Sequence, residues 1–427
     1  MLLRRITRTL LAAPWKIHVY SRPLASIPSR KRIDEVVPGS NGEIKLIWND
    51  GTSHAFRNVW VTYEDRQQDG DDVTIAFVQL RDQCQCSECV HPTTKQKLVD
   101  SASIPLDIAS SDVIVNDVGG LKVTWMNDSH RSVYDGNWLR ERAEKTTRPP
   151  SGPRLWKGMQ RVDSLPTTRY DRVMKNDGEL YAWLSGLHDN GLAIVNGVPL
   201  VKDTIRQFAE RIAYVKETIY GQLFDVIAQP DDDATHLAYT SQALDLHTDM
   251  NYREKSPGFQ MLHCLESKGP VDQGVSYFVD GFAAAEWLRH NHPSAFHILT
   301  SLPVEFAVHA SRKKYSQHVP IICTDSYGNV EEIHVNNRTL QTWGIPSNLI
   351  MPFFAAYKTF IQKLRDGSME VRFNLKEGDL VTFSNRRILH ARTGYDSKKM
   401  RRYLQGCYLD YDEVTSKLDS LRKNLET

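Results

Sequence analysis

Two histidines and one aspartate constrain this chain more than any other feature of its sequence. His247 and Asp249 lie one residue apart, and His390 follows much later. Two imidazoles and a carboxylate can occupy one face of an octahedral metal ion and leave the opposite face open, as in non-haem Fe(II) oxygenases. A strand suits the close pair, because residues i and i+2 of a strand point to the same side. The fold must then bring His390 beside that strand.

The residues around His390 favour an anionic cosubstrate next to the metal. His390 follows an apolar strand candidate and a turn, and Arg392, Arg401 and Arg402 come after it. An oxygenase that uses 2-oxoglutarate needs a cation for the distal carboxylate, and arginine supplies a bidentate fork. Two alternatives stay open. A lone His-x-Asp occurs by chance in many proteins, and any single arginine, Arg392 above all, can be a solvated surface charge.

Three cysteines within six positions predict a second metal site. Cys84, Cys86 and Cys89 can all reach one ion, and three thiolates favour Zn²⁺ in a tetrahedral structural site. Such a site needs a fourth ligand. His91 is nearest in sequence, and His130, at the end of a predicted hairpin, is the alternative. The competing interpretation is that the three cysteines bind no metal and are simply buried or free. Disulfide bridges are not expected, because six cysteines in 427 residues do not form a disulfide framework.

Composition and charge argue against two classes of partner. Hydrophobic residues make up 41% of the chain and charged residues 25%, which is ordinary for a globular protein. The formal charge of +1 gives no global field that would gather nucleic acid or an anionic membrane. No apolar run approaches the roughly 20 residues of a membrane span. We therefore expect neither nucleic-acid nor membrane partners.

The first 33 residues differ in composition from the rest of the chain. Residues 1–33 are rich in arginine and lysine and contain no acidic residue. Together with interspersed leucines, this composition is typical of a mitochondrial transit peptide. Pro14, Trp15 and Lys16 cut short the apolar run that a secretory signal needs. The prediction is a protein of the mitochondrial matrix, and the alternative is a disordered basic tail on a cytoplasmic protein.

Two hairpin signals predict a small β-rich domain over residues 38–145. Residues 43–48 alternate between polar and apolar and end in Asn-Asp-Gly, and residues 121–125 repeat the pattern before Asn-Asp. Residues 145–153 are rich in proline and are typical of a linker. The sequence therefore predicts a second domain over residues 154–427.

The second domain is predicted to be an antiparallel jelly roll buttressed by helices, because its strands and helices lack regular βαβ spacing. The fold class is thus mainly β with flanking helices. Apolar residues at helical spacing form stripes over residues 205–219, 353–364 and 414–425. Strand candidates are residues 192–195, 258–264, 275–279, 371–375 and 380–383.

Longer motifs carry a resemblance to a known family. They are His247-Thr248-Asp249, Val335-Asn336-Asn337 and residues 80–89, 256–264 and 279–282. From about residue 40 to its C-terminus, the chain resembles the family of γ-butyrobetaine dioxygenase and trimethyllysine dioxygenase. The resemblance implies a double-stranded β-helix domain that binds Fe(II) and uses 2-oxoglutarate and dioxygen. It also implies a small N-terminal zinc domain, ascorbate as reductant and a homodimer.

The resemblance assigns roles to individual positions. His130 is preferred over His91 as a zinc ligand, because it lies just ahead of residues 137–140, as in the family. Arg402, ahead of residues 404–406, matches the arginine that grips 2-oxoglutarate. Leu262 and Asn337 match positions that line the cosubstrate or substrate pocket. The implied metal ligands are His247, Asp249 and His390 for iron, and Cys84, Cys86, Cys89 and His130 for zinc.

The substrate of this family carries a trimethylammonium group, which aromatic faces hold because it has no hydrogen-bond donor. The matching positions are Tyr220, Phe224, Tyr239 and Tyr408, and for any one of them the alternative is a core aromatic. Phe224 stands where the family usually has tryptophan. His236 stands where the butyrobetaine enzyme has asparagine and the trimethyllysine enzyme has an acid.

The motifs divide between the two enzymes of the family. Residues 257–264 and 395–406 are more similar to the butyrobetaine enzyme, and residues 216–221 and 243–247 to the trimethyllysine enzyme. Since the C-terminal similarity is longer and continuous, the prediction is hydroxylation of γ-butyrobetaine to L-carnitine. The alternatives are trimethyllysine hydroxylation, a non-catalytic module that binds trimethylammonium compounds, and a zinc-dependent structural protein.

Residues 61–79 interrupt a stretch that the family runs almost without a break. The first half of this insertion is acidic and polar. One interpretation is a surface loop, because long loops cost little stability. The other is a translated intron, a hypothesis that the sequence of the transcript decides.

Overall fold

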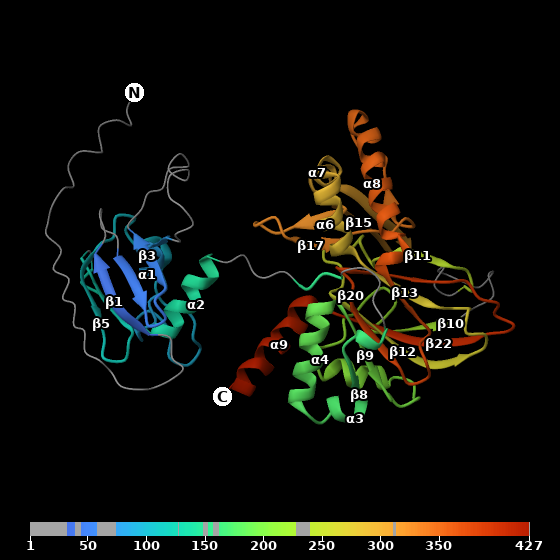
Figure 1. Ribbon diagram of the computed structural model, residues 1–427, viewed down its shortest axis with the longest axis horizontal. Coiled ribbons are helices and arrows are strands. Elements are labelled where there is room, and N and C mark those ends of the chain that lie inside the picture. The colour runs from blue at the N-terminus through green and yellow to red at the C-terminus, as the bar shows by residue number, and fades with distance from the viewer. Residues whose placement is uncertain are drawn as a thin grey trace. The chain divides into compact units, whose positions relative to one another are not determined.

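The chain folds into two compact units, residues 1–151 and residues 152–427 (Figure 1). The structure is a computed structural model, and each unit is described separately. It describes residues 32–38, 44–57, 74–126, 128–147, 153–156, 162–227, 240–310 and 313–426. The predicted transit peptide therefore lies almost entirely outside the described residues.

The N-terminal unit is built from two small sheets. The described strands of the first sheet have the order β1-β2-β3-β4, and those of the second have the order β5-β6-β7. Both predicted hairpins are present, as the antiparallel pairs β2-β3 and β6-β7. The strands are β1 (Ile33–Pro38), β2 (Ile44–Trp48), β3 (Ser53–Arg57), β4 (Thr74–Ala76), β5 (Ser110–Val115), β6 (Leu121–Trp125) and β7 (Arg131–Tyr134). The described helices are α1 (Phe77–Asp82) and α2 (Gly136–Thr147).

The boundaries of this unit differ from the predicted ones. β1 begins at Ile33, which is buried and pairs with Trp48, so folded structure starts before residue 38. Helix α2 extends to Thr147, into the predicted linker, and residues 148–152 lie outside the described residues. Only residues 74–79 of the insertion 61–79 are described. They form β4 and the start of α1, where the buried Phe77 meets Trp125 edge to face.

The C-terminal unit is a jelly roll whose two main sheets pair almost entirely antiparallel. In the described residues, the larger sheet has the order β10-β22-β12-β20-β9-β8 and the smaller has the order β11-β21-β13-β19. The larger sheet is made of β8 (Thr167–Arg169), β9 (Leu192–Asn196), β10 (Leu223–Ile227), β12 (Phe259–Lys268), β20 (Leu380–Ser384) and β22 (Arg401–Leu409). The smaller is made of β11 (Leu244–His247), β13 (Ser276–Asp280), β19 (Glu370–Phe373) and β21 (Ile388–Arg392). The predicted strand-rich fold class with flanking helices is thus confirmed.

Helices and short strands cover the sheets (Figure 1). Helix α4 lies beside α9 and packs on the larger sheet, where Leu180, Leu184, Met261 and Leu421 share one core. The helices are α3 (Tyr170–Val173), α4 (Asp177–Asn190), α5 (Thr204–Glu210), α6 (Gly281–Asn291), α7 (Pro293–Ser301), α8 (Ile350–Leu364) and α9 (Tyr411–Glu426). The remaining strands are β14 (Val304–Ala310), β15 (Lys313–Val319), β16 (Ile322–Thr324), β17 (Val330–Ile333) and β18 (Leu340–Gln341). Short 3-10 helices lie at Ser101–Ser103, Val162–Ser164, Ser347–Leu349 and Gly367–Met369.

One predicted helix is shorter than its apolar stripe. The stripe over residues 205–219 predicted a single helix, but α5 ends at Glu210. Ile212 and Val215 are nevertheless buried. Beyond the helix, the backbone N–H of Lys216 donates to the carbonyl of Tyr408 on β22. The stripe therefore reflects packing against the sheet core, and the backbone of this segment bonds to a strand in place of a helical turn.

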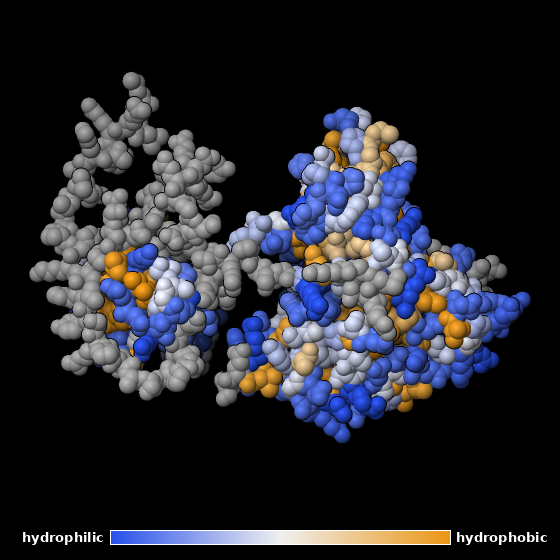
Figure 2. Space-filling model, in the orientation of Figure 1, coloured by the Kyte–Doolittle hydropathy of each residue, from blue (hydrophilic) through white to orange (hydrophobic). Residues whose placement is uncertain are grey.

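The surface of the C-terminal unit is mostly hydrophilic on the face that Figure 2 shows, with smaller hydrophobic patches. Among the described residues, no helix is both long enough and apolar enough to cross a bilayer.

Candidate functional site

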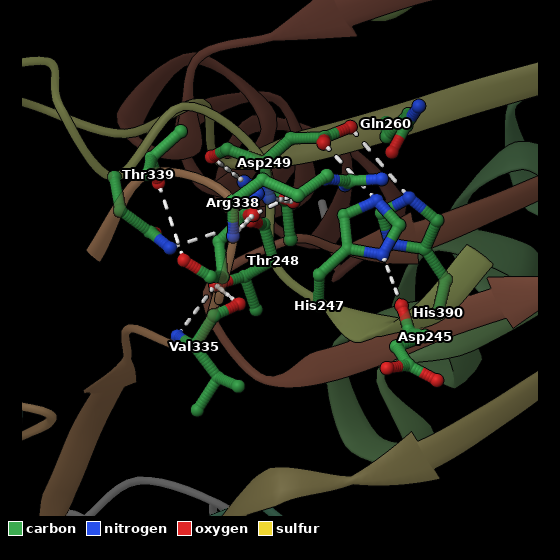
Figure 3. Close-up of polar contacts among 12 residues, drawn as sticks. Asp245, His247, Thr248, Asp249, Gln260, Val335, Arg338, Thr339 and His390 are labelled. Carbon is green, nitrogen blue, oxygen red and sulfur yellow. Dashed lines mark hydrogen bonds and ion pairs between the residues drawn. The ribbon is translucent and has the colours of Figure 1, made fainter. Parts of the chain in front are cut away.

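The three side chains of the first predicted metal site converge in the C-terminal unit. β11 and β21 pair antiparallel, and His247 lies directly opposite His390 in the register. Their ring centroids are 4.1 Å apart (Figure 3). Asp249 Oδ1 lies 3.5 Å from His247 Nε2, and Asp249 Oδ2 lies 3.6 Å from His390 Nε2. One ligand atom from each residue lies within 4.8 Å of the others, so all three can coordinate one ion.

Asp249 does not lie on the strand, contrary to the sequence prediction. β11 ends at His247, and the next residue, Thr248, donates its backbone N–H to the carbonyl of Val335. The buried side-chain amide of Asn385 then fixes Asp249 from both sides: it accepts from the Asp249 N–H at 2.8 Å and donates to the Asp249 carbonyl at 3.0 Å. A loop held by Asn385 therefore places the carboxylate beside the imidazoles.

The hydrogen bonds of the site prepare His247 for a metal. The carbonyl of Asp245 lies 2.7 Å from His247 Nδ1. A carbonyl can only accept, so Nδ1 carries the proton and Nε2 offers its lone pair to the metal. Figure 3 shows Nε2 of both imidazoles on the side that faces Asp249.

Burial and charge keep Asp249 and His390 in the form that binds metal. Burial alone would raise the pKa of Asp249, but His390, His247 and the Tyr408 hydroxyl together hold that pKa well below its usual range. Burial, the neighbouring His247 and the charge of Arg338 lower the pKa of His390 to about 3, against an opposing effect of Asp249. A deprotonated carboxylate and neutral imidazoles are the ligands that Fe(II) requires. The donor set therefore fits this metal.

A cavity of about 110 Å³ opens onto the three ligands. Aromatic rings, three arginines and a few small polar groups line it. The lining includes Tyr220, Phe224, Tyr252, Gln260, Leu262, Ser276, Asn336, Arg338, Arg392, Arg402 and Tyr408, in addition to His247, Asp249 and His390. The same cavity thus contains a metal-ligand cluster, cations and aromatic faces.

Two buried arginines define an anion-binding end of this cavity. Arg402 is 8% exposed, and its Nη2 donates to the Ser276 hydroxyl at 3.3 Å. Burial, followed by the nearby charge of Arg392, lowers the pKa of Arg402 to about 10. In the described part of the chain, no carboxylate forms an ion pair with Arg402. A buried guanidinium without a counter-ion is a strong site for a ligand carboxylate.

Arg392 is also part of this end, which corrects its interpretation as a surface charge. The side chain is 4% exposed and lines the cavity. Its Nη2 donates to the carbonyls of Thr240 and Gln242, at 2.7 and 2.6 Å. Arg392 therefore ties the segment ahead of β11 to the strand that carries His390.

The predicted aromatic positions that the structure describes lie together. Tyr220, Phe224 and Tyr408 all line the cavity, and Phe224 stacks on Tyr408 with ring centroids 5.1 Å apart. The hydroxyl of Tyr408 also donates to Asp249 Oδ2 at 2.8 Å, a contact that the sequence did not suggest. Tyr239 and His236, which were also predicted to contact the substrate, lie outside the described residues.

The remaining predicted pocket residues divide into one that lines the cavity and one that does not. Leu262 lines it, from the middle of β12. Asn337 is exposed and is absent from the lining of this cavity. Its neighbours Asn336 and Arg338 line the cavity instead. The three residues lie in a loop between strands, where no periodicity indicates which side chain points inward.

The second predicted metal site lies within the N-terminal unit. His130 Nε2 lies 3.3 Å from Cys84 Sγ and 3.5 Å from the Sγ atoms of both Cys86 and Cys89. These four ligand atoms lie within 4.8 Å of one another, which suits a tetrahedral Zn²⁺. His91 is turned elsewhere, since its Nδ1 accepts from the backbone N–H of Thr93 and Thr94.

Comparison with protein families follows the same division of the chain. Residues 159–408 match the model of the taurine catabolism dioxygenase TauD, TfdA family, which covers more than half of the chain. The chain belongs to this family. Residues 57–140 of this TauD/TfdA-family protein also match the gamma-butyrobetaine hydroxylase-like N-terminal model. The enzyme is accordingly a 2-oxoglutarate-dependent dioxygenase.

The relatives that match include proteins named for two different substrates. The chain is 35% identical to gamma-butyrobetaine dioxygenase of Pseudomonas sp. (strain AK-1), over 89% of this chain and 94% of that protein. It is 32% identical to gamma-butyrobetaine dioxygenase of Homo sapiens, over 90% and 95%. It is 28% identical to mitochondrial trimethyllysine dioxygenase of Bos taurus, over 87% and 89%. A solved taurine dioxygenase from Burkholderia xenovorans is 14% identical, with a TM-score of 0.45, over 60% of this chain and 89% of that one.

The sequence analysis assigned no role to several polar residues of this TauD/TfdA-family site, Ser276 among them. Asn385, Asn336, Arg338 and Gln260 are polar side chains that line the cavity or fix a ligand. Asn385 could have been suspected, since it lies in the same segment as His390. Asn336 and Gln260 lie in motifs that carry the family resemblance, but the sequence did not indicate that their side chains line the cavity, and it gave no signal for Arg338.

Proposed function

We propose that this dioxygenase hydroxylates γ-butyrobetaine to L-carnitine, as a step of carnitine biosynthesis. The observation that carries the proposal is the arrangement of one cavity: aromatic faces at Tyr220, Phe224 and Tyr408 open onto the same space as His247, Asp249 and His390. A quaternary ammonium group has no hydrogen to donate, and aromatic faces are the groups that bind it. The relatives named gamma-butyrobetaine dioxygenase support the same substrate.

His247, Asp249 and His390 hold Fe(II) in this proposal, and Arg402, with Ser276, holds the distal carboxylate of 2-oxoglutarate. Bound Fe(II) couples the oxidative decarboxylation of 2-oxoglutarate by dioxygen to hydroxylation of a C–H bond. Every other contribution comes from the chain's own side chains. Arg402 and Arg392 orient 2-oxoglutarate in the cavity. Asn385 fixes the backbone of Asp249, the carboxylate ligand.

The aromatic side chains determine which carbon reacts. Phe224 and Tyr408 are stacked on each other and are therefore restricted in motion, and the Tyr408 hydroxyl is bonded to Asp249. A cation held on these rings is thus held at a fixed distance from the metal ligands. A substrate held in this way presents one carbon to the metal site, and such orientation of the reacting groups accounts for much of the rate enhancement by enzymes.

Trimethyllysine is the second candidate substrate, because relatives with that name also match along most of their length. An assay of the purified protein with Fe(II), 2-oxoglutarate and ascorbate distinguishes the two substrates. Succinate and the hydroxylated product are measured with each substrate separately. We expect γ-butyrobetaine to give the higher kcat/KM. A higher kcat/KM for trimethyllysine would overturn the assignment, and the absence of both products would overturn the proposed function.

We further propose that Cys84, Cys86, Cys89 and His130 bind one structural Zn²⁺ and that the protein is a mitochondrial-matrix homodimer that requires ascorbate. The Sγ and Nε2 atoms of the cluster support the zinc site. The basic residues 1–33 and the mitochondrial relatives support the location. Elemental analysis tests the zinc, imaging of the tagged full-length chain tests the location, and analytical ultracentrifugation tests the dimer.

A further inference from the structure

Arg338 brings a third guanidinium into the cavity that Arg392 and Arg402 also line. It lies in the loop between β17 and β18, and its side chain is half-buried. Figure 3 shows the side chain extending from this loop toward the imidazoles of His247 and His390. It enters the cavity from a different element than Arg402, which lies on β22.

The contacts of Arg338 fix its stem and leave its charge without a partner in the described residues. Its Nε donates to Asn336 Oδ1 at 3.4 Å, and its backbone N–H donates to the same oxygen at 3.2 Å. An amide oxygen is neutral, so it orients the guanidinium without cancelling the charge. No carboxylate of the described residues forms an ion pair with Arg338, and Asp249 itself bonds to Tyr408 and faces the two histidines.

We propose that Arg338 binds the carboxylate of the organic substrate and so selects zwitterions such as γ-butyrobetaine; this inference rests on the proposed function. The aromatic faces bind the trimethylammonium group of the substrate, and Arg338 binds its carboxylate. The guanidinium offers the planar fork that matches a carboxylate. The substrate then lies between the aromatic faces and Arg338, with its middle carbons facing the metal ligands.

The charge of Arg338 also disfavours competing ligands. γ-Butyrobetaine carries one cation and one carboxylate, whereas trimethyllysine carries an additional α-ammonium next to its carboxylate. That ammonium would lie close to the Arg338 guanidinium, and two like charges in a partly buried cavity repel each other. A trimethylammonium compound without a carboxylate would leave Arg338 uncompensated. Arg338 thus favours binding of γ-butyrobetaine and disfavours binding of trimethyllysine and of trimethylammonium compounds without a carboxylate.

The test compares the wild-type enzyme with Arg338→Met and Arg338→Lys. Each protein is assayed with Fe(II), 2-oxoglutarate and either γ-butyrobetaine, trimethyllysine or butyltrimethylammonium. A charge-assisted hydrogen bond predicts that Arg338→Met raises the KM for γ-butyrobetaine by about tenfold or more. The KM for 2-oxoglutarate stays within about twofold of the wild-type value. The ratio of kcat/KM for γ-butyrobetaine to kcat/KM for trimethyllysine falls by about tenfold. Arg338→Lys recovers part of the loss, because it keeps the charge but not the fork.

A control and a spectroscopic measurement separate this role from a structural one. Arg422→Met removes an exposed arginine of α9 outside the cavity and should leave every KM unchanged. The visible charge-transfer band of the Fe(II)–2-oxoglutarate complex should be the same in Arg338→Met and the wild type. An unchanged KM for γ-butyrobetaine in Arg338→Met, or a loss that appears in the KM for 2-oxoglutarate, overturns the inference alone. A wild-type enzyme that turns over none of the three compounds overturns the proposed function and the inference together.

Discussion

The hydroxyl of Tyr408 donates a 2.8 Å hydrogen bond to Oδ2 of Asp249. The same ring stacks on Phe224, so one side chain joins the metal ligands to the aromatic end of the cavity. The side-chain amide of the buried Gln260 lies 3.5 Å from the Tyr408 hydroxyl and adds a third residue to this hydrogen-bonded group. If the aromatic faces bind the cation as proposed, its binding and the position of the Asp249 carboxylate are coupled through Tyr408.

Tyr408→Phe separates these two roles, because it removes the hydroxyl and keeps the ring. Groups that orient a metal ligand typically contribute about 10- to 100-fold to metal affinity. We expect weaker Fe(II) binding by a factor in this range and a small change in the KM for γ-butyrobetaine, measured by Fe(II) titration of activity. Tyr327→Phe, on an exposed tyrosine, is the control. Equal Fe(II) affinity in Tyr408→Phe and wild type would show that the hydrogen bond does not matter for the metal.

Replacing Asp249 with alanine tests the metal site directly. The variant removes the only carboxylate of the three-residue cluster and leaves two imidazoles, so we expect loss of Fe(II) binding and hydroxylation at background level. Asp245→Ala is a matched control two residues away. The Asp245 side chain is exposed, and its backbone carbonyl, which holds His247, is kept. An Asp249→Ala protein that still hydroxylates γ-butyrobetaine would contradict the assignment of Asp249 as a metal ligand.

Local pattern was sufficient to predict much of this fold. The hairpins β2-β3 and β6-β7 follow from alternation that ends at turn residues, and the strands and helices near the site follow from periodicity of 2 and 3.6. The convergence of His390 on the His-x-Asp pair also agrees with the residue types. These features depend on neighbours in the sequence or on the chemistry of a donor set.

The rest of the site depends on contacts between distant segments, which a single sequence does not reveal. Asp249 is held by Asn385, and Arg392 is buried because the carbonyls of Thr240 and Gln242 accept its hydrogen bonds. The direction of Asn336, as opposed to Asn337, is decided by a loop conformation. In each case the deciding partner lies far along the chain or outside any regular element.

Cys86→Ser tests the proposed zinc site in the N-terminal unit. Structural Zn²⁺ binding contributes on the order of 10 kcal/mol to the folding of small domains, comparable to the whole stability of a typical domain. We expect the variant to lose stoichiometric zinc and to show an N-terminal unit that unfolds at a much lower temperature. Cys323→Ser, at a half-buried cysteine outside the cluster, is the control. A wild-type protein that is purified without zinc and keeps its thermal transition would contradict the prediction.

Gly406→Ala tests the aromatic end of the cavity without touching a polar group. A Cβ at residue 406 would overlap the ring of Phe224 and lie 3.0 Å from Leu262. The ring must therefore leave its place beside Tyr408, and we expect the KM for γ-butyrobetaine to rise roughly tenfold, as for loss of a cation–π contact. Gly344→Ala adds a methyl group in open space and is the control. If Gly406→Ala binds γ-butyrobetaine normally, Phe224 is a core aromatic and not a binding residue.

We expect the buried His263 to make the stability of the C-terminal unit depend on pH. Its side chain is completely buried in β12, and burial lowers its pKa to about 4, whereas an unfolded histidine has a pKa of about 6.5. Between these two values the unfolded state binds the proton and the folded state does not, so stability falls as the pH is lowered through this window. From pH 7 to pH 5 the contribution of His263 is a loss of about 2 kcal/mol. Urea denaturation of metal-free wild type and His263→Leu at both pH values measures it. The variant should lose less stability than wild type by about that amount, and parallel pH profiles would exclude His263 as the cause.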